Sequence, residues 1–143
     1  MLIFLCFAII SIIALKLWMN KRLKRSAIVI LHAFAGWIVC AAIMGAGPMI
    51  FSMFTTLIIH LIGGPLFFVL VSAFYFKRFN YTTPVQTALI FISFVIVVDF
   101  FLVAMIILKS YEMFKSPMGT WIPFALIFLS TLITGLLVNK KTK

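Results

Sequence analysis

The chain has 143 residues, of which 66% are hydrophobic and 10% are charged, and its mean hydropathy is +1.32. A chain of this composition would aggregate in water, so the composition excludes a soluble globular protein and predicts an integral membrane protein. The formal net charge of +10 does not indicate nucleic-acid binding, because the basic residues stand at the ends of apolar runs. No segment between those runs is long enough to fold by itself, so we expect one helical membrane domain over residues 1–143 and no nucleic-acid partner.

Five apolar segments are each long enough to cross a membrane as a helix, for which about 20 residues suffice. They are, in chain order, Leu2–Met19, Ala27–Gly45, Met49–Phe76, Val85–Leu108 and Thr120–Val138. The predicted fold class is therefore an all-α membrane protein, a bundle of five transmembrane helices. The first segment has alternative interpretations, as a secretory signal or as a signal anchor beside a four-helix core. A cleaved signal is the weaker of these, because the basic residues follow the apolar run instead of preceding it.

The second and third segments form one long stretch without a charged residue, from Ala27 to Phe76. Gly45, Gly47 and Pro48 interrupt this stretch and predict a tight hairpin between two helices. Small residues in the second segment have the spacing that lets transmembrane helices approach closely, and they predict a packing face: Gly36, Cys40, Ala41 and Gly45. The other cysteine, Cys6, has no metal-binding spacing to Cys40, so we expect both to fill apolar space and we expect no metal site.

The later helix starts have recognisable capping signals. Thr83 before Pro84 predicts an N-cap and a first-turn proline for the fourth helix. The fifth helix has two alternative starts, Ser116 with Pro117 or Gly119 with Thr120.

The basic residues are distributed unequally between the two sides of the predicted membrane. Ten of the twelve fall on one side, and the other two, Lys109 and Lys115, fall on the opposite side with Glu112. The positive-inside rule predicts that the ten are cytoplasmic, with the N-terminus outside and the C-terminus inside. We also expect anionic lipid headgroups to be attracted by the basic cluster that follows the first segment: Lys21, Arg22, Lys24 and Arg25.

Asp99 is the most informative residue of the chain. It is one of only two acids, and it lies within the uncharged fourth segment. An acid near the centre of a membrane helix costs about 2.5–3.5 kcal/mol on insertion scales. Asp99 therefore needs either a partner or a function.

Other polar residues are expected at the depth of Asp99. With a rise of about 1.5 Å per residue, Asp99, His60 and the pair Ser130 and Thr131 all lie roughly 14–17 Å from the outer ends of their helices. Thr56 precedes His60 by one helical turn and extends the polar face outward. These five residues are the candidates for a ligand-binding or proton-binding site.

Three interpretations of His60 and Asp99 are open. In the first, the two form a hydrogen-bonded pair at the bottom of an outward-facing polar path, where they exchange protons or hold a ligand. In the second, the same pair only fixes helix packing. In the third, Asp99 contacts another subunit.

A helix break is a further candidate feature beside His60. Gly63, Gly64 and Pro65 follow one turn later, and proline with two glycines allows a helix to bend or unwind. Broken helices near the middle of a membrane often line substrate sites in transporters. The alternative is a plain kink that serves packing.

No motif in the chain indicates an enzyme, since metalloprotease, serine-hydrolase and nucleotide-loop signatures are all missing from the sequence. We therefore expect a non-catalytic membrane subunit or an assembly module, without a cofactor. The alternative is a small oligomeric transporter or channel-like protein that uses His60 and Asp99. In either case we expect a homo-oligomer or a subunit of a membrane complex. A bacterial or archaeal plasma membrane is the expected location.

Overall fold

The computed structural model describes residues 21–107 and 109–141, all within helices or the short connections between them. The elements are α2 (Lys21–Ile50), α3 (Met53–Arg78), α4 (Pro84–Val98), the π-helix η1 (Asp99–Ile107), the 3-10 helix η2 (Glu112–Lys115), the π-helix η3 (Pro117–Trp121) and α5 (Ile122–Lys141). The predicted first segment, Leu2–Met19, lies outside the described residues. The count of five spans, the signal-anchor alternative and the orientation of the N-terminus therefore stay predictions.

Within the described part of the chain, four helical stretches are long and apolar enough to cross a membrane. They are Leu23–Ile50, Met53–Arg78, Pro84–Ile107 and Pro117–Lys140, and the last two combine α-helix with π-helix. The all-α prediction is confirmed in this coarser form: the described chain is helical, and four of its helices are long and apolar enough to span a membrane.

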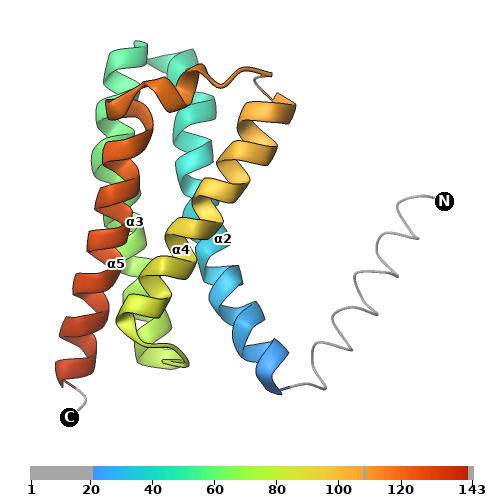
Figure 1. Cartoon of the computed structure of the whole chain (residues 1–143). Helices are drawn as coiled ribbons and strands as arrows, with labels where there is room; N and C mark the ends of the chain where they lie inside the picture. Colours follow the sequence, from blue (N-terminus) through green and yellow to red (C-terminus); the bar gives the residue numbers. More distant parts are fainter. Residues whose placement is uncertain (1–20, 108, 142–143) are drawn as a thin grey trace.

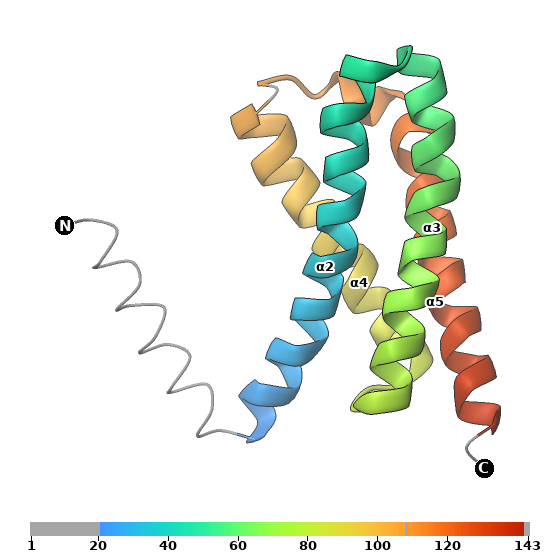
Figure 2. The ribbon, with the colours of Figure 1, turned by 180° about the vertical axis from the view of Figure 1, so that it is seen from behind.

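The four long helices run up and down and surround a common interior (Figures 1 and 2). Helix α2 packs against α3 and α4, and α5 packs against the same two helices. Helices α3 and α4 are consecutive in the chain but face each other across the diagonal of the bundle. Figure 1 shows α4 crossing its neighbours obliquely, while α3 and α5 run alongside each other.

The two ends of the bundle carry different residues. The start of α2, the turn from α3 to α4 and the end of α5 meet at one end, which we call the basic end because Lys24, Arg25, Lys77, Arg78 and Lys140 are found there (Figure 1). The turn from α2 to α3 and the segment with η2 and η3 form the distal end. The predicted separation of basic residues thus corresponds to the two ends of the described bundle.

The predicted hairpin break between α2 and α3 is displaced. Helix α2 continues through Gly45 and Pro48 to Ile50, and the chain turns at Phe51 and Ser52. Pro48 is tolerated because it lies in the last turn, where little of the helix remains to be disrupted. Ser52 ends the turn, because its Oγ accepts the Thr55 N–H at 3.2 Å and caps α3.

The capping predictions for the later helices are confirmed. Thr83 caps α4 in a capping box: its Oγ1 accepts the Gln86 N–H at 3.3 Å, and Gln86 Oε1 accepts the Thr83 N–H at 3.1 Å. Of the two alternative starts for the fifth helix, the first is the one found. Ser116 Oγ accepts the Gly119 N–H at 3.0 Å and opens η3, which leads into α5.

The predicted packing face on α2 is real at Gly36 and Cys40. A Cβ atom at Gly36 would lie 2.6 Å from Cζ of Phe68, so the missing side chain makes room for this fully buried ring of α3. Cys40 is buried and lies against Gly64 of α3. Gly45 is different, since nothing lies within 4 Å of a Cβ built there.

A buried polar network closes the turn between α3 and α4 at the basic end. Tyr75 is fully buried, and its hydroxyl is 2.7 Å from Thr82 Oγ1 and accepts the Tyr81 N–H at 3.2 Å. Thr82 Oγ1 is in turn 2.7 Å from Thr87 Oγ1, which donates to the Thr83 carbonyl at 3.0 Å. The network gives these buried hydroxyls partners where no water reaches them.

Replacing Tyr75 by Phe should therefore lower the free energy of unfolding by about 1–3 kcal/mol, because the hydroxyl of Thr82 and the N–H of Tyr81 lose their partner. Thermal unfolding in detergent micelles measures this loss. Tyr111→Phe is the matched control, since the Tyr111 side chain is exposed at the distal end. Equal stability of the two variants would contradict a stabilising role for the network.

Candidate functional site

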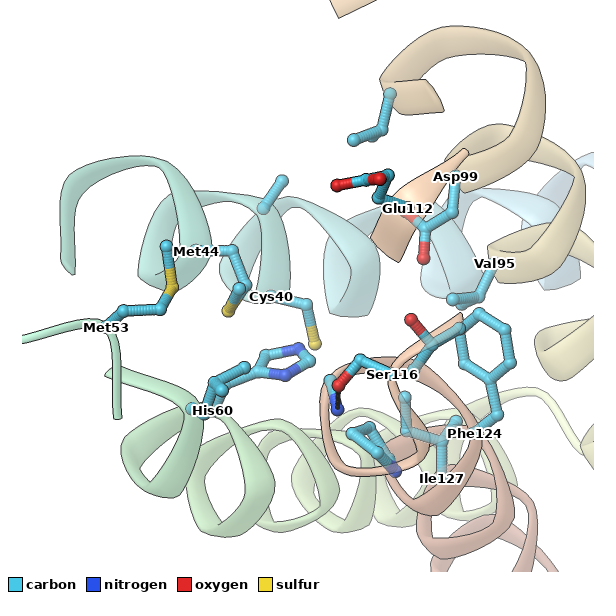
Figure 3. Close-up of a pocket in the computed structure, with 16 residues that line it drawn as sticks. Cys40, Met44, Met53, His60, Val95, Asp99, Glu112, Ser116, Phe124 and Ile127 are labelled. Carbon is cyan, nitrogen blue, oxygen red and sulfur yellow. Dashed lines mark hydrogen bonds between the residues drawn. The ribbon is translucent and has the colours of Figure 1, made fainter. Parts of the chain in front are cut away.

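A cavity of about 570 Å³ lies inside the bundle toward its distal end. Its walls come from α2, α3, α4 with η1, and the segment from η2 to α5, so every long described helix contributes. The volume is within the range of small-molecule sites in proteins, roughly 300–1,000 Å³. Figure 3 shows the lining side chains converging from these helices on one space.

The lining is mostly apolar, with a few polar groups. The polar members are the side chains of Cys40, His60, Asp99, Glu112, Ser116 and Thr120. No lysine or arginine of the described residues lines the cavity. Asp99 and Glu112 are the only two acids in the sequence, so both carboxylates of this basic chain face the same space.

Asp99 stands where the helix geometry changes. It is the C-cap of α4 and the first residue of the π-helix η1. The partner of Asp99 is on α2: Trp37 Nε1 donates a hydrogen bond to Asp99 Oδ1 at 2.8 Å.

Trp37 is the site residue that the sequence analysis missed. Its side chain is buried, and the indole N–H requires an acceptor when the ring is away from water. The sequence contains a usable signal, because Trp37 lies well inside its span whereas most membrane tryptophans lie at the interfaces. A tryptophan in that position predicts an acceptor on a neighbouring helix, and Asp99 fits.

His60 lines the cavity but does not bind Asp99. Its side chain is only 8% exposed, and its Nδ1 has no hydrogen-bond partner. The predicted hydrogen-bonded pair is therefore wrong, although both residues face the same space. The reason is that α3 and α4 lie diagonally opposite each other in the bundle. Two residues predicted at the same depth need not be in contact when their helices are not neighbours.

The other three candidates, Thr56, Ser130 and Thr131, do not line the cavity. Ser130 Oγ donates to the Ile127 carbonyl at 3.0 Å, and Thr56 Oγ1 donates to the Ser52 carbonyl at 3.1 Å. Serine and threonine commonly satisfy their hydroxyls within their own helix in this way. Thr131 is fully buried elsewhere, and its Oγ1 has no partner.

The predicted unwinding at Gly63, Gly64 and Pro65 does not occur, since α3 is α-helical throughout these residues. Their contribution is close approach. A Cβ at Gly64 would lie 3.2 Å from Cys40 Sγ and 3.8 Å from His60 Nε2. Gly64 thus lets the Cys40 thiol and the His60 ring lie on the same wall of the cavity.

Several polar lining residues were not expected in the site, among them Cys40 and Glu112. Cys40, predicted as apolar filler, points its sulfur into the cavity near the His60 ring (Figure 3). Glu112 was assigned only to the outer connection, yet it lines the mouth. Its side chain is 82% exposed, and its Oε1 is 3.8 Å from Lys115 Nζ. A surface pair of this kind contributes about 0–1 kcal/mol and is easily exchanged.

Fold and site together define a class, a helical membrane bundle with an internal, partly acidic cavity near one end. Comparison of the chain with protein-family models, with curated proteins and with solved structures finds no match in any of the three. The argument for function therefore depends on the cavity.

Proposed function

We propose that this protein is a small membrane transporter that takes up its ligand from the distal end of the bundle. The observation that carries the proposal is the convergence of Asp99, Glu112 and His60 on one cavity of about 570 Å³. An ionisable residue inside a membrane is costly and commonly marks an ion or substrate pathway. Asp99 has one donor, Trp37 Nε1, and His60 Nδ1 has no partner, so both residues keep hydrogen-bonding capacity that a ligand can use.

The orientation follows from the charges. The positive-inside rule makes the basic end cytoplasmic, so the cavity mouth near Glu112 faces outward. The proposed membrane is a bacterial or archaeal plasma membrane. We also propose that the protein works as a homo-oligomer, with its exposed apolar helix surfaces available for contacts between copies.

The test uses the full chain reconstituted in liposomes that contain a pH-sensitive dye. Asp99→Asn and His60→Ala should each lower proton flux by about tenfold or more while leaving thermal stability in detergent near that of the parent, as expected for groups that take part in proton transfer. Ser130→Ala is the control, since Ser130 does not line the cavity. If both variants lose thermal stability, and flux falls only in proportion to the loss of folded protein, the result would favour a structural role.

A second candidate is a non-catalytic membrane subunit, and the Trp37–Asp99 hydrogen bond favours it. A buried acid held by an indole N–H can serve to fix α2 against α4 without any ligand. In this case flux is absent from the parent protein. Purification from native membranes should then recover a partner subunit together with the chain.

Anionic lipids are a proposed partner at the basic end. Lys24 and Arg25 are exposed in the first turns of α2, and the Arg25 guanidinium lies 5.4 Å from the centre of the Tyr81 ring. Together with Lys21 and Arg22, they form the cluster that is proposed to attract acidic headgroups.

A further inference from the structure

We infer that the cavity selects a monovalent organic ammonium ion with an apolar body. This inference deepens the proposed transport function, on which it rests, by naming the chemical class of the ligand. It depends on the charge of the lining, on its apolar remainder and on the free hydrogen-bonding capacity of His60.

The charge of the lining favours a cation. Asp99 and Glu112 both face the cavity, and among the described residues no lysine or arginine does. Trp37 Nε1 donates a hydrogen bond to Asp99 Oδ1, but the indole is neutral and does not balance the charge of the carboxylate. Lys115 lies 3.8 Å from Glu112, and both side chains are exposed, so an entering cation competes with a weak, solvated ion pair.

The rest of the lining favours an apolar body. Val95, Phe124 and Ile127 form the deep wall beside Asp99, and Met44, Met53 and Leu57 form the side nearer the mouth. An inorganic ion would leave this surface without a partner, whereas an organic cation buries its hydrocarbon part against it. The face of an aromatic ring such as Phe124 also attracts ammonium groups.

His60 supplies the second, independent observation. Its side chain is 8% exposed and its Nδ1 has no partner, and its ring lies at the cavity wall (Figure 3). Nδ1 itself is shielded, but the ring lies at the cavity wall, and a neutral imidazole has one nitrogen that can accept from an ammonium N–H. A metal ion is a poor alternative, since no group of three or more His, Cys, Asp or Glu among the described residues is arranged to hold one.

The Cys40 thiol offers a direct test, because it lines the same cavity. In a Cys6→Ser background, Cys40 is the remaining cysteine. We compare the rates at which Cys40 reacts with two methanethiosulfonates, the cationic aminoethyl reagent and the anionic sulfonatoethyl reagent. Each rate is divided by the rate at which the same reagent reacts with a free thiol in solution. We expect the cationic reagent to react about tenfold faster, since acidic clefts concentrate cations to at least this extent.

Two variants test whether the carboxylates cause the preference. Asp99→Asn and Glu112→Gln should each reduce the rate ratio. Because the Glu112 side chain is 82% exposed, we expect at least the second variant to fold. A Cys6→Ser, Cys40→Ser chain gives the background. Equal normalised rates, or a ratio that neither variant changes, overturn the cation inference but leave an accessible cavity and the transport proposal intact. No labelling by either reagent overturns both.

Protection of Cys40 identifies the ligand body. Phenethylammonium should slow labelling with the anionic reagent, whereas 2-phenylethanol, which has the same apolar body without the charge, should not. Failure of the ammonium compound to protect better than the alcohol overturns the inference.

The ammonium group can come from a free amine or from an ethanolamine lipid headgroup. Vesicles of choline lipids with and without ethanolamine lipid distinguish these sources, since a lipid source protects Cys40 before any amine is added.

Discussion

Replacing Trp37 by Phe should lower the free energy of unfolding by about 1.5–3 kcal/mol, which is the range for hydrogen bonds to charged groups. The variant keeps a ring on α2 but removes the indole N–H that donates to Asp99 Oδ1 at 2.8 Å. Asp99 then has no donor among its described contacts, within a helix that is apolar enough to cross a membrane. Unfolding in detergent micelles, followed by the loss of helical signal, measures the change.

A double-mutant cycle with Asp99→Leu separates the hydrogen bond from the lost ring volume. Leucine removes the carboxylate, so the Trp37→Phe change should cost at least about 1 kcal/mol less in the Asp99→Leu background, as expected for two residues in contact. Additive effects of the two changes would contradict the hydrogen bond as a source of stability. The single Asp99→Leu variant is also informative, because normal stability combined with lost flux would favour the transport proposal over a structural role.

Replacing Gly36 by Leu should destabilise the bundle by about 3 kcal/mol, at the upper end of the cost of overpacking a core. A Cβ at this position would lie 2.6 Å from Cζ of Phe68. The Phe68 ring is fully buried and packs against Phe91 with ring centres 5.8 Å apart, so it has little room to move. The whole contact between α2 and α3 would have to open.

Gly45→Leu is the matched control on the same helix. Nothing lies within 4 Å of a Cβ at Gly45, and the residue is exposed, so leucine there should leave the stability unchanged or raise it slightly through helix propensity. Both variants are compared by the midpoint of thermal unfolding in the same detergent. Similar midpoints for the two would show that the close approach at Gly36 does not limit stability.

Short-range features were predictable wherever one local interaction decides them. Thr83 and Ser116 were identified as caps because a hydroxyl just before a first-turn proline is well placed to accept the N–H three residues on. The hairpin after α2 was misplaced because two signals competed: Pro48 and its neighbouring glycines suggested a break, but Ser52 and Thr55 cap the next helix more effectively. Of the two alternatives for Gly63 to Pro65, unwinding does not occur, because packing against α2 at Cys40 keeps α3 regular where its own sequence permits unwinding.

The sequence by itself determined the apolar helical class, the approximate helical spans between residues 21 and 141, the unequal ends and the placement of Asp99 and His60 within spans. Those properties depend on hydropathy, on charge and on position along a helix, and each of these follows from the order of residues in the chain. Only the tertiary structure decided which residues meet. Because α2 lies beside α4 and α3 lies diagonal to it, Asp99 binds Trp37, while His60 faces the same cavity unpaired. Depth is a property of each helix alone, but the direction in which a side chain points is fixed by the neighbours against which the helix packs.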